Sequence, residues 1–239
     1  MSYNLPRLLI DTNKTSPMPT KKVYRLSSNE LKYMLHLEKK FNKAGLGFTR
    51  WPEIYYCNKK IEKPQEEQLF ELNPPLDKIF DVDYLGAYIS RKNEEGIIEL
   101  YQNRIHECAQ RISEALGLNL KQTVESLHFI VLMHELGHWF THYCLPQDFH
   151  KKRAASFYKQ STAIVETMAQ LTVVWALDPI KDEFAKRTKL IFDYMVPRQP
   201  SPYQQFLRLG TKMNRMNLII KRYLAVLDKR TNDLDYLLN

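Results

Sequence analysis

Apolar residues recur at helical spacing, or fill whole helical turns, through most of the chain after residue 103. Such stretches form helices with one apolar side or with apolar residues all round. The pattern therefore favours a succession of helices in the second half of the chain. The predicted helices cover residues 104–116, the stretch between Asn119 and Pro146, residues 151–177, residues 182–195 and a segment that begins at Ser201.

Residues that favour helix ends stand at the borders of these stretches. Gly117 suits a C-terminal end because glycine adopts left-handed backbone angles freely, and Asn119 is a good N-cap. Asp178-Pro179 stops the third helix, since proline has no N–H to donate. Ser201-Pro202 places a cap before a proline at the first helical position, and Gly210 predicts a break within the last segment.

A further helix is predicted near the N-terminus. Ser27 and Glu30 have the spacing of a capping box, in which each side chain accepts from the other residue's backbone N–H. The helix should run to about Ala44, where Gly45 and Gly47 end it. Its apolar face is expected to consist of Leu31, Met34, Leu35 and Phe41.

Two segments rich in β-branched and aromatic residues, 84–90 and 96–102, are separated by a polar turn and predict a β-hairpin. Residues 48–82 carry several prolines among aromatic residues, which indicates an irregular cover with a short helix over residues 65–71. Residues 1–22 are expected to be extended, because their prolines oppose a helix.

These elements predict an α+β fold that is mostly helical, with a small antiparallel hairpin or sheet packed on a central helix. A length of 239 residues suits one compact domain. Within it we distinguish an N-terminal extension and cover over residues 1–83, a core over residues 84–178, and a C-terminal helical segment over residues 179–239.

The composition is that of a globular protein with a basic surface: 44% of residues are hydrophobic and the net charge is +8. A basic surface could attract nucleic acid. The lysines and arginines are scattered, however, and no zinc finger or RNA-binding signature accompanies them. Nucleic acid is therefore not the expected partner. Nothing in the pattern fixes the oligomeric state.

The chain carries no feature of a membrane or secreted protein. Its longest apolar run, residues 129–133, is too short to span a bilayer, and the N-terminus lacks the pattern of a signal peptide. The spacing of Cys57, Cys108 and Cys144 fits neither a disulfide framework nor a cysteine zinc site. A cytoplasmic location is expected.

The stretch IVLMHELGHWFTHYC places His134, Glu135, His138 and His142 in an apolar run. Residues four apart on a helix have Cβ atoms about 5–6 Å apart, so His134 and His138 can bind one ion. Glu135 points about 100° round the helix. This is the His-Glu-x-x-His arrangement of zinc hydrolases, in which the metal lowers the pKa of a water to about 7 and the glutamate acts as general base.

The surroundings of this motif favour a metal site over incidental core histidines. The helix is apolar nearly all round, which indicates that it is buried, and buried polar side chains need partners. A metal ion satisfies several of them together. Gly137, between the two histidines, should allow another element to approach closely.

His142 continues the spacing of four, but a continuous helix places it about 12 Å from His134 along the axis. One zinc ion with bonds of about 2 Å cannot span that distance. No glycine follows His138 to turn the chain out of the helix. His142 is therefore expected to be a neighbour of the site or a surface residue.

The third ligand is expected from the next helix. Glu166 is the only acidic residue of that helix, and a lone carboxylate among apolar residues needs a partner. The small residues Ala163 and Ala169 should let the two helices pack tightly as antiparallel neighbours. The alternative is a buried salt bridge from Glu166 to Arg153 or to a lysine.

The sequence His134-Glu135-x-x-His138 followed by Glu166 resembles the gluzincin branch of the zincin-like metallopeptidases. In that family the glutamate stands in a Glu-x-x-(Ser/Asp/Ala) context, and residues 166–169 fit it. The resemblance covers about residues 84–178. It implies that His134, His138 and Glu166 bind Zn²⁺ and that Glu135 is the base.

The resemblance also implies a hairpin before the metal-binding helix, with residues 96–102 as an edge strand that pairs with extended substrate. Some relatives have an aspartate where this chain has Gln170, whose amide could still accept from a ligand imidazole. The family often stabilises the oxyanion with a later tyrosine or histidine, for which Tyr203, His142 and Tyr143 are the candidates.

The chain is thus expected to be a zinc metallopeptidase that hydrolyses peptide bonds with a metal-activated water. A second hypothesis is a regulatory or partner-binding protein on a zincin scaffold, with narrow or no peptidase activity. A third is hydrolysis of a non-peptide amide or ester at the same metal site, because one fold supports many reactions.

Overall fold

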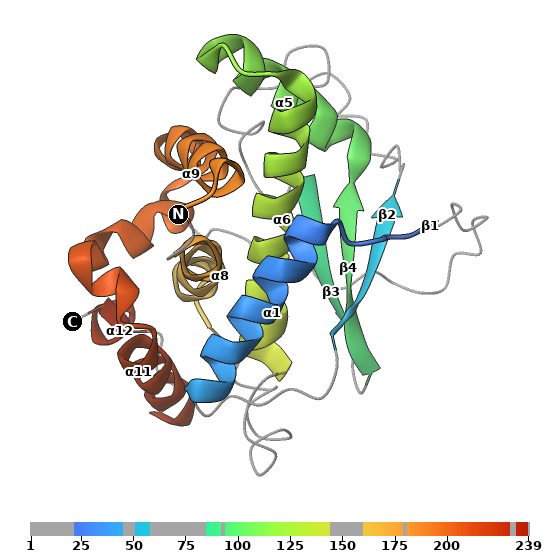
Figure 1. The fold of residues 1–239 in the computed structure, drawn as a ribbon. Coiled ribbons are helices and arrows are strands. Elements are labelled where there is room, and N and C mark those ends of the chain that lie inside the picture. Colours follow the sequence, from blue (N-terminus) through green and yellow to red (C-terminus); the bar gives the residue numbers. More distant parts are fainter. Residues whose placement is uncertain are drawn as a thin grey trace, which may run out of the picture.

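The computed structural model of the chain describes residues 22–44, 51–57, 85–91, 94–143, 160–178, 181–229 and 233–238. Helices predominate among these residues, and a small mixed sheet lies on one side of them (Figure 1). The predicted α+β, mostly helical fold class is confirmed. Residues 1–21 and the short helix expected over residues 65–71 lie outside the described residues.

The sheet has the strand order β1-β2-β4-β3 in the described part of the chain. β3 (Gly86–Arg91) and β4 (Glu94–Tyr101) pair antiparallel, which confirms the predicted hairpin. β2 (Glu53–Cys57) pairs parallel with β4, and β1 (Lys22–Val23) pairs antiparallel with β2.

β2 was not predicted and lies in the region expected to be irregular cover. Ile54 pairs with Ile98 of β4 and is buried, so this short strand contributes to the core. Its presence places β4 between two neighbours. The expectation that residues 96–102 form an edge strand is therefore wrong, and in the described part of the sheet the strand beyond β4 is β3.

α1 (Ser28–Lys43) begins with the predicted capping box. The Ser27 Oγ atom accepts from the Glu30 N–H at 3.2 Å, and a Glu30 carboxylate oxygen accepts from the Ser27 N–H at 2.7 Å. Gly45 and Gly47, which were expected to end the helix, lie outside the described residues.

The apolar face predicted for α1 is only half right. Leu31 and Leu35 are 47% and 44% exposed, so the prediction that they face the core is wrong. The helix is rotated so that Tyr33 packs edge-on against Phe129 with ring centroids 4.9 Å apart. A buried aromatic ring removes more apolar area from water than an aliphatic side chain, which favours this face. The buried side chains of α1 are Glu30, Tyr33, Met34, Leu37 and Phe41.

The end predicted for the next helix at Gly117 and the start predicted for the following one at Asn119 are both confirmed. α5 (Gln102–Leu116) ends at Gly117, whose φ of 64° is in the left-handed region that glycine favours. α6 (Leu120–Tyr143) begins after Asn119, whose side-chain oxygen accepts from the Gln122 N–H at 3.2 Å.

α8 (Thr162–Leu177) begins later than predicted. Gln160 and Ser161 precede the helix, and residues 151–159 lie outside the described part of the chain. α9 (Glu183–Met195) starts where expected, with the Asp182 carboxylate accepting from the Ala185 N–H at 2.8 Å.

The C-terminal segment is helical with a break, as predicted. Gly210 has φ 51° and ψ −128°, which interrupts the helical backbone within η3. The elements of this segment are η2 (Val196–Arg198), α10 (Ser201–Gln204), η3 (Gln205–Asn214), α11 (Met216–Lys229) and α12 (Leu234–Leu238).

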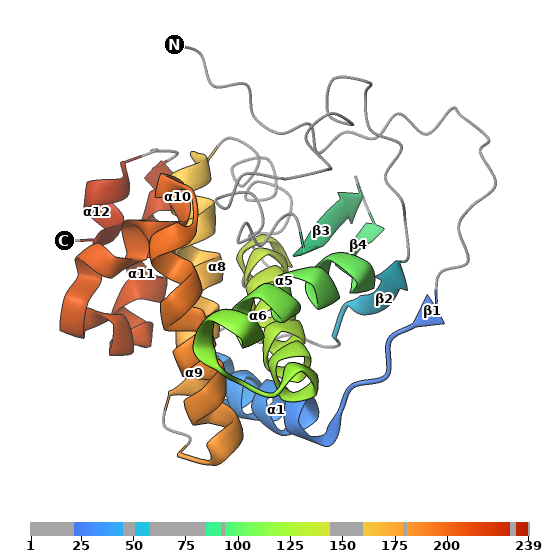
Figure 2. The ribbon, with the colours of Figure 1, turned by 90° about the horizontal axis from the view of Figure 1, so that it is seen from above.

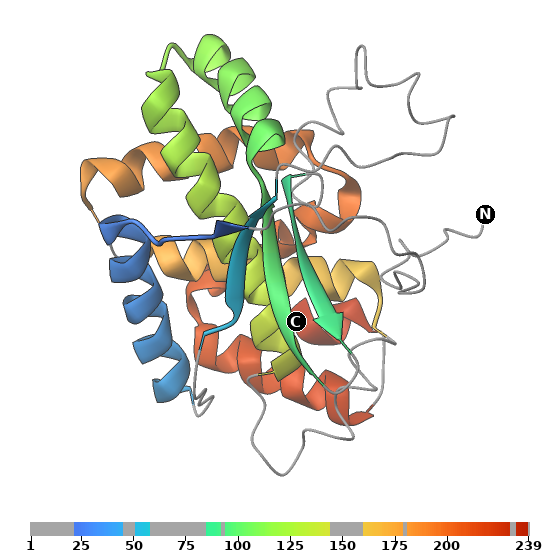
Figure 3. The same cartoon turned by 90° about the vertical axis from the view of Figure 1, so that its right-hand side faces the viewer.

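α6 lies between the sheet and the helices that follow it, α8 to α12, as Figures 1 and 2 show. α8 crosses α6 steeply: in Figure 1 α6 runs up the page while α8 is seen nearly end-on, and Figure 3 shows α8 lying across it. The prediction of antiparallel neighbours is therefore wrong. Among the described residues, no helix combines the length and apolar character that a membrane crossing requires.

Candidate metal centre

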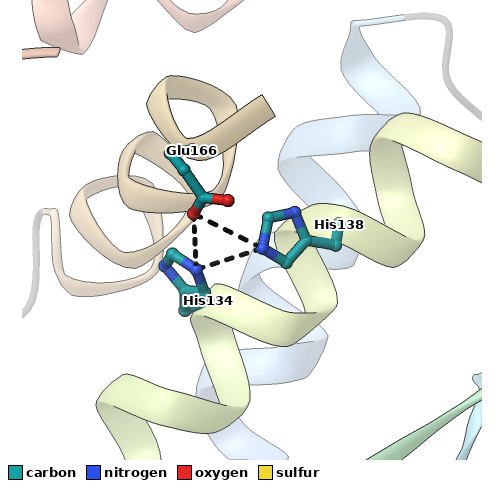
Figure 4. Close-up of side chains that lie close together, drawn as sticks. All are labelled: His134, His138 and Glu166. Carbon is teal, nitrogen blue, oxygen red and sulfur yellow. Dashed lines mark hydrogen bonds and ion pairs between the residues drawn. The ribbon is translucent and has the colours of Figure 1, made fainter. Parts of the chain in front are cut away.

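His134 and His138 lie one turn apart on α6, and their imidazole rings converge. Their Nε2 atoms are 3.1 Å apart, and the rings meet nearly at right angles with centroids 4.8 Å apart. His134 is fully buried and His138 is 7% exposed. The helical spacing that the sequence offered therefore places both ring nitrogens at one point (Figure 4).

Glu166 reaches the same point from α8. One of its carboxylate oxygens lies 3.1 Å from the His134 Nε2 atom and 3.6 Å from the His138 Nε2 atom. The structure thus brings together the three side chains proposed as ligands from the sequence (Figure 4). Arg153, one of the cations considered for the alternative salt bridge, lies outside the described residues.

Gly137 accounts for the close approach of α8. A Cβ atom at this position would lie 2.6 Å from the Ala169 Cα atom and 2.9 Å from the Thr172 Oγ1 atom. The expectation that Gly137 admits another element is confirmed, and that element is α8. Because Glu166 lies one turn before Ala169, this contact brings its carboxylate to the histidines.

The three groups fit a divalent metal ion. Tetrahedral bonds of about 2.0–2.1 Å place ligand atoms about 3.3–3.4 Å apart. The observed separations of 3.1, 3.1 and 3.6 Å lie close to these values. Two imidazole nitrogens and a carboxylate oxygen each offer a lone pair. A buried convergence of such atoms is favourable when a cation lies among them.

Glu135 lies on α6 where the helix faces the hairpin. A Cβ atom on Gly86, at the start of β3, would lie 3.4 Å from the Glu135 Cγ atom and 2.6 Å from a Val131 methyl. The Glu135 side chain is 1% exposed. Burial raises the pKa of Tyr101, and the Glu99 and Glu135 carboxylates raise it further. The candidate base is therefore enclosed beside β3 and near the end of β4.

His142 is buried rather than at the surface, and it lies outside the group formed by the three ligands. Its Nδ1 atom is 2.8 Å from the hydroxyl of Tyr88 in β3. Burial lowers its pKa to about 4, which keeps the ring neutral. The Tyr88 ring occupies the space beside Gly96, where a Cβ atom would lie 2.3 Å from it. His142 therefore links α6 to the hairpin.

Tyr203, from α10, packs beside the candidate centre. Its ring stacks on the His134 imidazole, with centroids 5.9 Å apart and an angle of 26° between the planes. Tyr203 is 5% exposed. Of the candidates for oxyanion stabilisation, this residue is the one in ring contact with a proposed ligand. The side chain of Tyr143 lies outside the described residues.

The sequence left open that the Gln170 amide oxygen accepts from a ligand imidazole. Its Nε2 atom instead donates to the Gln199 Oε1 atom at 2.8 Å. Sequence reasoning missed Gln199 and Tyr88 as neighbours of the site. For Tyr88 a signal existed, because Gly96 is its diagonal neighbour across the hairpin and a glycine there leaves room for a ring. For Gln199 the sequence carries no such signal.

Comparisons of the chain with known protein families, with curated proteins and with solved structures found no match.

Proposed function

We propose that the chain is a zinc-dependent metallopeptidase with a zincin-like core. The observation that carries the proposal is the convergence of His134, His138 and Glu166, from two crossing helices, beside a glutamate in the next helical position. Two histidines and one carboxylate leave a position open for water or substrate, as in catalytic zinc sites.

The donor set supports zinc as the metal. Imidazole suits several transition metals, whereas magnesium and calcium prefer oxygen ligands. A set of two histidines and one carboxylate also occurs in non-haem iron sites. We favour zinc because Glu135 follows His134 directly, in the arrangement used by zinc hydrolases. When bound, the ion supplies Lewis-acid activation of a water molecule and of the substrate carbonyl.

In this proposal Glu135 moves the proton. Its carboxylate accepts a proton from the attacking water as the new C–O bond forms, and delivers it to the amine nitrogen as the C–N bond breaks. The sum is one water consumed and one carboxylic acid and one amine released. Its enclosure beside β3 supports this role, because a base works best where bulk water does not compete.

Tyr203 is the candidate that we assign to the developing oxyanion. Its ring lies against His134, which supports this role, and a tyrosine hydroxyl can donate to an oxyanion. We give His142 no such role, because it lies outside the group of the three ligands and its Nδ1 atom contacts Tyr88 of the hairpin.

Burial of the centre favours a narrow choice of partner. His134, Glu135 and Glu166 are each no more than 4% exposed. This observation also suits the second candidate function, a partner-binding or regulatory protein that keeps the metal but turns over few peptides or none. We propose a peptide or protein partner in both cases. A cytoplasmic location is in keeping with the buried thiols of Cys57 and Cys108.

The deciding experiment combines metal analysis with a peptide-library screen of the full chain. We expect about one zinc per chain, with anomalous scattering at the zinc edge between the three ligands, and cleavage of peptides by the wild-type protein. Glu135→Gln should retain zinc and lose cleavage. Undiminished cleavage by Glu135→Gln would refute the mechanism. Bound zinc with no cleavage of any peptide would favour the partner-binding function.

A further inference from the structure

Two buried amides join α8 to the segment that precedes α10. Gln170 lies one turn after Glu166 on α8 and is fully buried, and Gln199 is 4% exposed. The Gln170 Nε2 atom donates to the Gln199 Oε1 atom at 2.8 Å. This amide pair is a direct side-chain link between the helix that carries Glu166 and the C-terminal segment.

Gln199 is in turn fixed to α10. Its backbone carbonyl accepts from the Gln204 Nε2 atom at 2.6 Å. The next residue, Pro200, accepts from the Tyr203 N–H at 3.0 Å. The segment from Gln199 to Gln204 is therefore a turn closed by two hydrogen bonds. A displacement of Gln199 should displace Tyr203 with it.

Tyr203 carries this connection to a proposed ligand, because its ring stacks on the His134 imidazole. α8 thus reaches His134 in two ways. Glu166 contacts the His134 Nε2 atom directly at 3.1 Å. Gln170, one turn further along the same helix, reaches the imidazole face through Gln199 and Tyr203.

We propose that the Gln170–Gln199 amide pair positions Tyr203 against His134, and so holds that imidazole with its Nε2 atom directed at Glu166 and His138. The proposal rests on the metal centre described above, but not on peptide hydrolysis. Gln170 and Gln199 are positioning residues: they act through Tyr203 and do not touch the ion.

Neutral amides suit this role better than a carboxylate would. An ionised carboxylate at residue 170 has no N–H and could not donate to the Gln199 Oε1 atom, as the Gln170 amide does. An amide supplies the hydrogen bond without changing the charge of the centre. Removing groups that orient a ligand histidine typically weakens metal affinity by about 10- to 100-fold.

The test measures metal binding by the full chain. Zn²⁺ affinity is determined by competition with a chromophoric chelator, and Co²⁺ is used as a spectroscopic probe of ligand geometry. Gln170→Leu and Gln199→Leu should each weaken Zn²⁺ binding by about 10-fold and change the visible Co²⁺ spectrum. Because both act through one hydrogen bond, the double variant should bind no more weakly than either single variant.

Gln205→Leu is the matched control. Gln205 lies next to this turn but is only half-buried and bonds to Ser201, so its loss should leave affinity and spectrum unchanged. Should the glutamine variants fail to fold, Tyr203→Leu removes the stacked ring itself and should have the same effect on Zn²⁺ and Co²⁺.

The proposal is overturned if Zn²⁺ affinity stays within twofold of wild type and the Co²⁺ spectrum is unchanged in the variants of Gln170, Gln199 or Tyr203. An equal loss in Gln205→Leu, or additive losses in the double variant, also overturns it. A wild-type chain that binds neither ion overturns it together with the metal centre. A chain that binds zinc as expected but cleaves no peptide refutes only the peptidase.

Discussion

Gly137 of α6 lies directly against Ala169 of α8, with room for a hydrogen atom but not for a methyl group between them. The two positions mark the point where the helices cross. Since Glu166 lies one turn before Ala169 and His134 and His138 flank Gly137, the separation of the helices sets the distance between the carboxylate and the imidazoles.

Gly137→Ala should therefore weaken metal binding as well as folding. Its methyl group would lie 2.6 Å from the Ala169 Cα atom, so α8 must move outward. Overpacking of this kind costs about 1–3 kcal/mol of stability. We expect a lower denaturation midpoint and at least about a 10-fold loss of Zn²⁺ affinity, because the carboxylate leaves the centre.

Gly117→Ala serves as the control for stability alone. Gly117 has φ 64°, and a Cβ atom there would meet no other atom within 4 Å. Alanine at this position therefore strains the backbone by about 1–2 kcal/mol without crowding anything. It should lower the denaturation midpoint and leave Zn²⁺ affinity unchanged. Equal affinity in Gly137→Ala and wild type would contradict the role of the crossing.

Zinc should stabilise the folded chain through Glu166. A ligand that binds only the folded state at about 100 times its Kd adds about 2.7 kcal/mol to the free energy of unfolding. Glu166→Gln removes the negative charge but keeps the size of the side chain. The difference in the free energy of unfolding between excess Zn²⁺ and chelator should therefore largely disappear. Thermal unfolding with and without Zn²⁺ measures it. Glu183→Gln, at an exposed position of α9, should keep the full increment.

Gly86→Ala should impair turnover while sparing the metal. The added methyl would lie 2.6 Å from a Val131 methyl and 3.1 Å from the Glu99 carbonyl oxygen, so the hairpin must shift against α6 beside Glu135. No atom of the three ligands is among its nearest neighbours. On a peptide found by library screening, we expect kcat to fall about 10-fold. Complete loss of general-base catalysis would cost roughly 100-fold or more, but here the base keeps its carboxylate and only its surroundings shift. The zinc content should stay at the wild-type level.

Gly96→Ala provides the comparison, because it crowds the Tyr88 ring in the same hairpin but not Glu135. It should lower stability and retain more of the turnover than Gly86→Ala. Equal kcat losses in the two variants would show that the hairpin as a whole matters rather than the space beside the base.

Acid should destabilise the fold through His128 and His142. Burial lowers the pKa of each to about 4, below the value of about 6.5 expected in the unfolded chain. Between these values the unfolded chain binds protons that the folded chain does not, so stability is greatest above pH 6.5 and is lost as the pH falls towards 4. The loss is on the order of 2–3 kcal/mol for each histidine.

Urea denaturation between pH 7 and pH 4.5 at constant ionic strength measures this slope. His128→Phe keeps a ring beside Tyr24 and Tyr56 but cannot bind a proton, so the slope should be shallower than in the wild type. His106→Gln, at an exposed position of α5, should leave it unchanged. A slope that is the same in His128→Phe and wild type would contradict the assignment.

Much of the fold was predictable because its signals are local. The capping box at Ser27, the glycine after α5 and the alternation in β3 and β4 each depend on residues close in sequence. The spacing of His134 and His138 is local in the same sense, since the geometry of one helix brings their rings together.

What could not be predicted depends on pairs that are distant in the chain. β2 pairs in parallel with β4. Parallel strands are not joined by a tight turn, so no local turn signal in the sequence indicates this pairing. The partner of His142 is Tyr88, which reaches it from the hairpin. For α1 the difficulty is different: apolar residues occur on both sides of the helix. Contacts with residues distant in the chain, Phe129 and Phe184, select Tyr33 over Leu31 and Leu35 for the buried side.

Because the candidate centre is divided between two helices, the affinity for a metal ion should depend on how far the chain has folded. His134 and His138 can converge as soon as α6 forms, which gives an ion two nitrogens and weak binding. The Glu166 oxygen arrives only when α8 crosses at Gly137. In a rapid-mixing refolding experiment, the rate at which tight metal binding appears should therefore report the rate at which these two helices pack together.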